Sequence, residues 1–477
     1  MADCVFAGGT VATSEGVATV DVAFSDGVIT AIGDNLKASQ YIDIEGKILC
    51  PGGVDPHCHV EQMSGMGLMN ADDWSSATRS AALGGTTTLI SHMPQAKGQR
   101  LADAMADYAV RAEQGARIDH AFHMIVADPE AEALHDDLAA LIGAGHRTIK
   151  LFTTYNIGLS DRAIIEVMAT ARAAGALVCV HAENDGIIGY MKAALTRAGL
   201  TAPRHHALSH PRLAEIEAIE RMCRFAEFLD QPLMIFHVST REGVAAVRAA
   251  QARGAPVVAE TCTHYLFQTV DVLDKPSVEG AKWMCSPPQR LVEDQEALWE
   301  GLADGTLSLV SSDHAPFRFD DTGKLSAGAA PPFTSIANGQ PGLELRNTMM
   351  FDAMVSKGRL GLEAFVKLTA TAPARLHGLD RKGTIKVGMD ADLVVWNPDR
   401  RHTYGANDLH DAVGYNPAEG HAVQGWPELV MLRGEVIVKD GVDLTTPGAG
   451  QFQPRDRAGP PKTGRQAPEL EAMKAET

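Results

Sequence analysis

The chain has 477 residues, of which 45% are hydrophobic and 21% charged, and its formal net charge at pH 7 is −18. This length is sufficient for one large domain and a smaller one. The acidic balance argues against a nucleic-acid partner and against binding to anionic membranes, because both recognise basic patches.

The sequence also contains no apolar run of about 18 residues, the length that a transmembrane helix needs. Its amino terminus lacks the basic region and apolar core of a secretory signal. The seven cysteines form no Cys-x-x-Cys pair, which argues against a disulfide framework or a thiolate zinc site. We therefore expect a reduced, cytoplasmic protein without a membrane-spanning segment.

Three short strands are expected near the amino terminus, over residues 20–24, 28–32 and 41–44. From residue 49 onward, short apolar runs alternate with alanine-rich stretches of helical length. The runs predict barrel strands over 49–54, 87–92, 120–126, 148–153, 177–181, 233–238, 257–261 and 307–312. Helices are predicted between them, for example over 102–114, 161–174, 214–229 and 241–253.

Eight strands that alternate with helices predict a parallel (β/α)8 TIM barrel, which is an α/β fold. The runs are apolar nearly throughout, as expected of strands that are buried on both faces.

Beyond the barrel, short strands are again expected over 392–396, 429–432 and 436–439. We expect these strands to pair with the amino-terminal ones in a small β-sandwich built from both termini.

The predicted division of the chain follows from these elements. Residues 1–50 and 379–445 are expected to form the β-sandwich domain, and residues 51–378 the catalytic barrel. Residues 446–477 are rich in proline, glycine and charge. This composition predicts a flexible carboxyl-terminal tail or an arm on a neighbouring subunit.

Metal-ligand residues stand at the ends of the predicted barrel strands. His57 and His59 are two positions apart, and such side chains point to the same side of a strand. Alone, this pair is as often two solvated or buried histidines as two ligands. Later strands end in His181, His237 and Asp313. Reactive groups of such barrels lie at the carboxyl ends of the strands, and these residue types suit zinc or a similar divalent ion.

A lysine, Lys150, lies inside an otherwise apolar predicted strand. Burial disfavours its charged form and lowers its pKa. The neutral amine can react with carbon dioxide, and the two oxygens of the resulting carbamate can bridge two metals about 3.5–4 Å apart. The alternative is a lysine that reaches the barrel mouth or pairs with an acid. The neighbouring metal-ligand residues favour the carbamate.

Short motifs occur in a fixed order through residues 1–440. They are Pro51-Gly-Gly-Val-Asp-Pro-His-Cys-His59, Gly84-Gly-Thr-Thr87, Lys150-Leu-Phe-Thr-Thr-Tyr155, His181-Ala-Glu183, His237-Val-Ser239, Cys285-Ser-Pro-Pro288, Ser312-Asp-His314, Phe333-Thr-Ser-Ile-Ala-Asn-Gly-Gln-Pro-Gly342, Tyr415-Asn-Pro-Ala-Glu-Gly420 and Gly425-Trp-Pro427. Together they resemble the cyclic amidohydrolases, and within that family the dihydropyrimidinases and D-hydantoinases. This resemblance implies a hydrolase of cyclic amides.

The resemblance implies a ligand set for two divalent metal ions, which we expect to be zinc. His57 and His59 would bind the more buried metal, and His181 and His237 the other. Lys150, carboxylated by carbon dioxide to N6-carboxylysine, would bridge the two. Asp313 would complete the set as a ligand to the first metal.

The resemblance also implies catalytic and substrate-binding groups. Asp313 would act as general base and then as general acid towards the leaving nitrogen. Tyr155 would donate to the oxyanion, although a tyrosine at a barrel mouth can also simply face water. Ser286 and Asn338 match positions whose backbone groups hold the amide edge of the ring. The alternative for Ser286 is a place in an ordinary turn before Pro287, and the alternative for Asn338 is an ordinary loop asparagine.

The expected reaction is the opening of a dihydropyrimidine or hydantoin-type ureide by a metal-bridging hydroxide. Two alternatives stay open. The substrate can be a cyclic imide or another lactam, since the amide-binding groups are generic. The chain can also be a non-catalytic assembly relative, but it retains all six ligand residues. A small-molecule substrate and a homo-oligomer, either tetramer or dimer, are the expected partners.

Substrate preference depends on the loop after His59. Relatives that hydrolyse dihydroorotate have an arginine at the position of Glu61, so a carboxylate there predicts that anionic substrates are disfavoured. The methionine-rich residues 63–69 predict an adaptable apolar wall for the substituent, or else ordinary core packing.

Histidines outside the ligand set are expected to be structural; they are His92, His123, His205, His206 and His264.

Overall fold

The structure is a computed structural model, and it describes residues 2–464 and 467. Its centre is a sheet of eight strands in sequence order, each parallel to the next. The strands are β8 (Gly53–Cys58), β9 (Thr86–Met93), β10 (Asp119–Ile125), β11 (Thr148–Phe152), β12 (Leu177–His181), β13 (Leu233–Ile235), β14 (Val257–Cys262) and β15 (Leu309–Ser311).

The two ends of this sheet meet and nearly close it into a barrel. The His59 amide donates to the carbonyl of His314 at 2.7 Å, and Cys58 forms a parallel bridge with His314. Because the strands curl back on themselves, their carboxyl ends gather around one opening. The predicted TIM barrel is confirmed.

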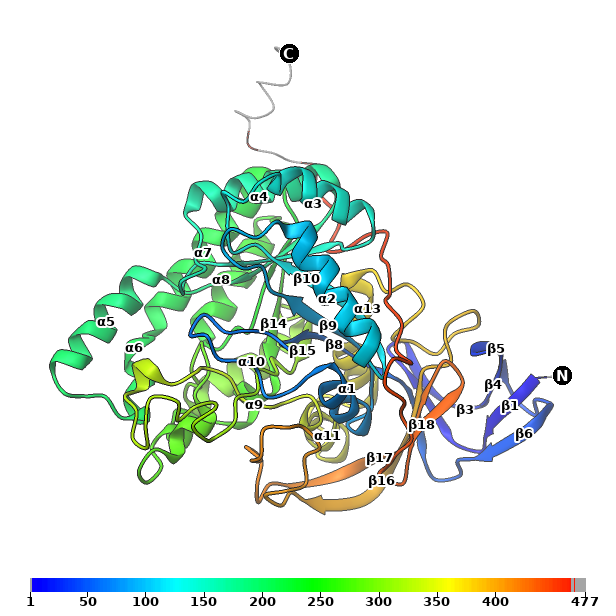
Figure 1. Cartoon of the computed structure of the whole chain (residues 1–477). Helices are drawn as coiled ribbons and strands as arrows, with labels where there is room; N and C mark the ends of the chain where they lie inside the picture. The colour runs from blue at the N-terminus through cyan, green and yellow to red at the C-terminus, as the bar shows by residue number, and fades with distance from the viewer. Residues whose placement is uncertain (1, 465–466, 468–477) are drawn as a thin grey trace, which may run out of the picture.

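Helices surround the barrel, as Figure 1 shows. They are α1 (Trp74–Leu83), α2 (Leu101–Gly115), α3 (Leu134–Gly143), α4 (Asp161–Ala174), α5 (Asp185–Arg197), α6 (His206–Ser209), α7 (Arg212–Leu229), α8 (Arg241–Ala252), α9 (Thr263–Phe267), α10 (Val292–Asp304), α11 (Leu345–Phe351), α12 (Leu362–Val366) and α13 (Ala372–His377). Local chemistry sets their limits. For α4, the Ser160 side chain caps the first turn, and Gly175 ends the helix in a left-handed conformation.

Two further sheets contain the terminal strands. One has the order β5-β4-β1-β6 and the other β19-β18-β17-β16-β7-β2-β3. Their strands are β1 (Ala2–Ala7), β2 (Thr10–Thr13), β3 (Gly16–Thr19), β4 (Asp21–Ser25), β5 (Val28–Gly33), β6 (Ala38–Asp43), β7 (Ile48–Pro51), β16 (Leu393–Thr403), β17 (Ala422–Leu432), β18 (Glu435–Lys439) and β19 (Val442–Asp443). Buried side chains of both termini, including Phe6, Ile29, Leu393 and Met431, form one core. Figure 1 shows the strands of the two termini beside each other, away from the barrel. The exact domain limits stay a prediction.

The strand predicted over 49–54 is in fact two strands. β7 pairs with β16 of the terminal sheet, whereas β8 begins the barrel two residues later. Gly52 lies between the two strands. No larger residue fits there without a shift of its neighbours, because an added Cβ would stand 2.1 Å from Thr87 Oγ1. The apolar run is continuous, so the sequence pattern could not mark the point at which the chain changes sheets.

The flexible tail predicted for 446–477 is wrong for residues 446–464. This segment runs along the barrel (Figure 1), where the Gln453 amide donates to the His120 carbonyl at 2.8 Å. Arg455 is buried, and its guanidinium donates to the Phe122 carbonyl at 2.8 Å. Proline and glycine prevent a regular helix or strand here, but they do not prevent hydrogen bonds to the barrel. Residues 465–466 and 468–477 lie outside the described part of the chain.

All seven cysteines are free and buried. Within the described residues, no helix combines the length and apolarity that a membrane span requires.

Candidate metal centre and active site

A cavity of about 350 Å³ opens at the carboxyl ends of the barrel strands. This size falls within the usual range of small-molecule sites, about 300–1,000 Å³. Every site residue predicted from the sequence lines it: His57, His59, Lys150, Tyr155, His181, His237, Ser286, Asp313 and Asn338. The structure thus brings together side chains that are up to 281 residues apart in the sequence, from His57 to Asn338.

The first group of candidate ligands is His57, His59 and Asp313. Asp313 Oδ1 lies 3.1 Å from His57 Nε2 and 3.4 Å from His59 Nε2. Burial by itself would raise the pKa of Asp313, but the charge of His57 and hydrogen bonds from both histidines hold this pKa well below its usual value. Two imidazole nitrogens and a carboxylate therefore converge in a buried place, as a divalent metal requires.

The second group is Lys150, His181 and His237. Lys150 is only 1% exposed, and its Nζ lies 4.0 Å from the centre of the Phe236 ring. Burial lowers the pKa of Lys150 to about 8 although Asp313 acts in the opposite direction. The rings of His181 and His237 have their centres 4.5 Å apart. Burial therefore makes the neutral form of this amine more accessible than that of an exposed lysine.

Three of the ligand histidines are held by a second side chain at their other ring nitrogen. His57 Nδ1 is hydrogen-bonded to Glu260. His59 Nδ1 lies 2.7 Å from Gln62 Oε1, and His181 Nε2 lies 2.8 Å from Glu183 Oε2. Such contacts fix the tautomer and the orientation of a ligand imidazole. The nitrogens that remain available to bind a metal are therefore His57 Nε2, His59 Nε2 and His181 Nδ1.

The predicted catalytic and substrate-binding residues lie beside these ligands. Asn338 Nδ2 donates to the Tyr155 hydroxyl at 3.4 Å, and Ser286 Oγ donates to Glu183 at 2.6 Å. Burial and the charge of Glu183 raise the pKa of Tyr155, so its hydroxyl keeps the proton that an oxyanion donor needs. Tyr155, His237 and Asp313 all have positive φ angles, 68°, 41° and 46°. Backbone strain of this kind is concentrated at functional sites.

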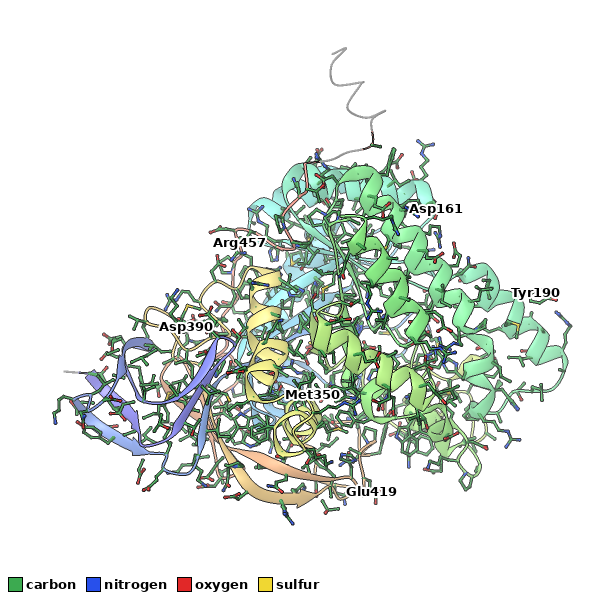
Figure 2. All side chains as sticks on the ribbon, turned by 180° about the vertical axis from the view of Figure 1, so that it is seen from behind. Asp161, Tyr190, Met350, Asp390, Glu419 and Arg457 are labelled. Atoms are coloured by element: carbon green, nitrogen blue, oxygen red, sulfur yellow. The ribbon has the colours of Figure 1, made fainter. Side chains whose placement is uncertain are left out.

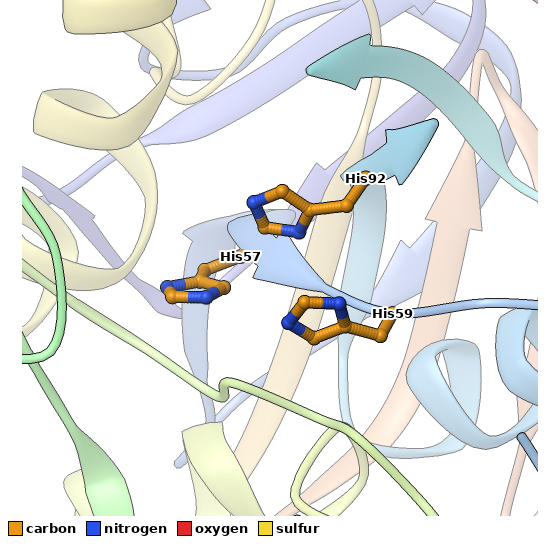
Figure 3. A group of neighbouring side chains, drawn as sticks. All are labelled: His57, His59 and His92. Carbon is orange, nitrogen blue, oxygen red and sulfur yellow. The ribbon is translucent and has the colours of Figure 1, made fainter. Parts of the chain in front are cut away.

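The sequence argument missed one residue of the site, Glu260, and assigned structural roles to two others, His92 and His206. His92 offers a ligand atom within 4.8 Å of those of His57 and His59, and Figure 3 shows the three side chains together. His92 was expected to be structural. Its position near the end of a predicted strand was the sequence feature that could have placed it at the site. Glu260 was not singled out, although a carboxylate inside an apolar strand is the same signal that marked Lys150. His206, also expected to be structural, lines the cavity.

The loop after His59 differs from its predicted role. Among its apolar residues only Met66 lines the cavity; Met63 and Met69 pair with each other and are 49% and 44% exposed. Glu61 does not line the cavity. Its carboxylate instead lies 3.6 Å from Arg111 Nη1. The charge of Glu61 is therefore compensated outside the cavity, which removes the argument that it repels anionic substrates.

Comparison with known proteins identifies the family. Residues 48–437 match the amidohydrolase family. This chain belongs to the amidohydrolase family. It is 38% identical to a D-hydantoinase of Rhizobium radiobacter and 39% identical to one of Ralstonia pickettii. Each alignment spans 458 residues and covers 95% of this chain and 99% of the relative.

Solved structures give the same result for the fold. A D-hydantoinase structure superimposes with a TM-score of 0.92 at 38% identity, over 96% of this chain and 100% of the other. The dihydropyrimidinase of Brevibacillus agri NCHU1002 gives a TM-score of 0.92 at 35% identity, over 96% and 99% of the two chains. The predicted resemblance to the cyclic amidohydrolases is thus confirmed.

Proposed function

We propose that this amidohydrolase opens cyclic ureides, of the hydantoin or dihydropyrimidine type, by hydrolysing a ring amide bond. The observation that carries the proposal is the convergence of six metal-ligand side chains with Tyr155 in one cavity. The names of the relatives, D-hydantoinase and dihydropyrimidinase, support this class of substrate. The product is the open-chain carbamoyl acid.

The donor set fits two divalent metal ions, which we propose to be zinc. His57, His59 and Asp313 hold one, and His181 and His237 the other. Lys150 would add to carbon dioxide, forming one N–C bond and releasing one proton, and the resulting carbamate would offer two oxygen ligands between the two groups of histidines. When bound, such metals lower the pKa of water to near neutrality and polarise a carbonyl group.

The residues of the chain supply the remaining chemistry. The Asp313 carboxylate accepts the proton of the attacking water and returns it to the ring nitrogen as the C–N bond breaks. The Tyr155 hydroxyl donates a hydrogen bond to the carbonyl oxygen as negative charge develops on it. The backbone at Ser286 and Asn338 holds the amide edge of the ring. One water molecule is thereby added across the amide bond.

A substrate panel tests this proposal. The panel contains dihydrouracil, 5-substituted hydantoins, allantoin, dihydroorotate and succinimide, compared by kcat/KM with Asp313→Asn as the inactive control. We expect ureides of the hydantoin or dihydropyrimidine type to rank first. If succinimide ranks first, the enzyme is an imidase instead. If nothing is hydrolysed by protein that contains two metals per chain, the proposal is wrong.

Two further expectations belong with this function. We propose a cytoplasmic location and a homo-oligomer of four or two chains. Light scattering coupled to gel filtration measures the mass of the assembly against the 50.8 kDa of one chain. A monomer at micromolar concentration would contradict the second expectation.

A further inference from the structure

Lys192 is a cation in the substrate cavity that the proposed reaction does not use. It lies on α5, which begins four residues after the ligand His181, and its side chain lines the cavity. Figure 2 shows this helix at the outer edge of the molecule, where Tyr190 is exposed. Lys192 itself is only half-buried. It therefore lies where the substituent of a bound ring can meet it.

The ammonium group of Lys192 has no partner within the described residues. No carboxylate oxygen of that part of the chain lies within 4.0 Å of it, and its Nζ makes no hydrogen bond there. Lys382, by contrast, has carboxylate oxygens of Asp119, Asp390 and Asp392 at 2.6, 2.9 and 2.8 Å. Because Lys192 is only half-buried and has no protein partner within the described residues, its ammonium group is free to contact a ligand in the cavity.

The acids nearest to Lys192 are occupied by other groups. Glu183 accepts hydrogen bonds from His181, His210 and Ser286. Asp185 accepts one from Thr154 at 2.9 Å. Burial lowers the pKa of Lys192, and these two carboxylates act in the opposite direction. Glu183 and Asp185 thus favour the charged form of Lys192, although neither forms an ion pair with it.

Few charged side chains line the cavity. Asp313, a proposed metal ligand, is the only carboxylate among the lining residues, and Lys192 is the only lysine or arginine besides the proposed ligand Lys150. Gln62, Ser64, Asn156 and Thr334 add neutral polar groups to the lining. The cavity can therefore accept a negative charge at Lys192, because the two nearby carboxylates, Glu183 and Asp185, are not part of its lining.

We propose that Lys192 binds a carboxylate on the exocyclic substituent of the substrate, so that the preferred ureides are those with a short acidic side chain. The inference rests on the proposed ring hydrolysis and narrows its substrate class. A charged hydrogen bond to a carboxylate is stronger than one to a neutral group. The carboxylate of the substrate is thus the ion-pair partner that no described residue provides for Lys192. The ring stays neutral and occupies the metal end of the cavity.

The test compares two substrates of nearly equal shape, 5-(2-carboxyethyl)hydantoin and its primary amide. We expect the native enzyme to prefer the acid by about tenfold or more in kcat/KM, mainly through KM. In Lys192→Met this acid-to-amide ratio should fall by at least about tenfold, and Lys192→Arg should restore most of it. A tenfold change corresponds to about 1.4 kcal/mol.

Arg197→Met is the matched control, because Arg197 is exposed on the same helix and does not line the cavity. This variant removes one positive charge and should leave the acid-to-amide ratio unchanged. If both variants lower the ratio equally, long-range charge explains the preference and the inference is wrong. If neutral hydantoins are hydrolysed but the native enzyme does not prefer the acid, the inference fails while the proposed function stands.

Binding gives a readout that does not depend on turnover. Calorimetric titration of the inactive Asp313→Asn protein, with and without Lys192→Met, yields the Kd of each hydantoin. We expect the acid to bind about tenfold more tightly only when Lys192 is present. Equal Kd values for acid and amide in the presence of Lys192 would overturn the inference even if no ureide were turned over.

Discussion

At the scale of single residues, the site is defined by buried polar groups that lack an ordinary structural explanation. Lys150 lies against aromatic rings instead of a carboxylate, and the imidazole nitrogens of His57 and His59 converge on the Asp313 carboxylate. Both are costly to bury in this state. The proposed pair of metals, with a carboxylated Lys150 between them, would satisfy both groups at once.

Replacing Lys150 by alanine tests this explanation. Native protein purified without chelator should contain close to two divalent metals per chain by elemental analysis, and intact mass should show an added carboxyl group. Lys150→Ala should lose at least one metal and nearly all turnover, because the bridge between the two halves is gone.

Lys386→Ala, a change at an exposed lysine, serves as the control and should keep both metals. A native content near one metal, with Lys150→Ala unaltered in metal and activity, would refute the bridge.

At the scale of elements, the two segments proposed to hold the ring are fastened to each other. The Gly339 amide donates to the Met284 carbonyl at 2.7 Å. Lys324, which is fully buried, donates from Nζ to the Ala337 carbonyl at 2.9 Å and to that of Met284 at 3.4 Å. Ser286 and Asn338 therefore keep their relative positions through one buried amine.

Replacing Lys324 by methionine should loosen this arrangement. The change leaves the Ala337 carbonyl without its donor and frees the segment that contains Asn338. We expect KM for the best ureide to rise about tenfold, a loss of about 1.4 kcal/mol in binding, with kcat and metal content much less affected. Steady-state kinetics with metal analysis measures both.

Lys382→Met is the matched control, since Lys382 is equally buried but lies among aspartates near the terminal sheet, where Figure 2 marks Asp390. It should lower stability without a selective rise in KM. The same KM change in both variants would mean that general destabilisation, and not the link between the two segments, sets substrate affinity.

At the scale of the whole molecule, both ends of the chain support the barrel. The terminal strands share a core, and the segment after β19 reaches back to β10 and to the start of β11. There Arg455 donates to Phe122, Thr148 and Gly145. Burial lowers the pKa of Arg455 to about 9, and its hydrogen bonds offset part of this cost.

Arg455→Met should lower the free energy of unfolding by about 2 kcal/mol, because hydrogen bonds from a buried charged group are lost and their acceptors stay buried. Urea or thermal unfolding monitored by circular dichroism measures the change. Arg457→Met is the control in the same segment. Arg457 pairs with Asp380 on the surface (Figure 2), and exposed ion pairs contribute about 0–1 kcal/mol. Equal effects of the two changes would mean that the segment does not stabilise the barrel.

The sequence alone determined the barrel, the order of its strands and the residues at the cavity. Apolar runs and alanine-rich stretches are local patterns, and a parallel barrel places every strand end at one opening. His57, His181, His237 and Asp313 could thus be grouped without knowledge of any contact between them. Their motifs also sufficed for the family.

Only the tertiary structure decided the features that depend on contacts between distant segments. It divided the apolar run at Gly52, turned Glu61 towards Arg111, and placed Glu260 behind His57. It also directed Lys192 into the cavity and Arg455 against the barrel. Periodicity specifies which positions share a face of an element, whereas the partner of each face is set by packing across the whole chain.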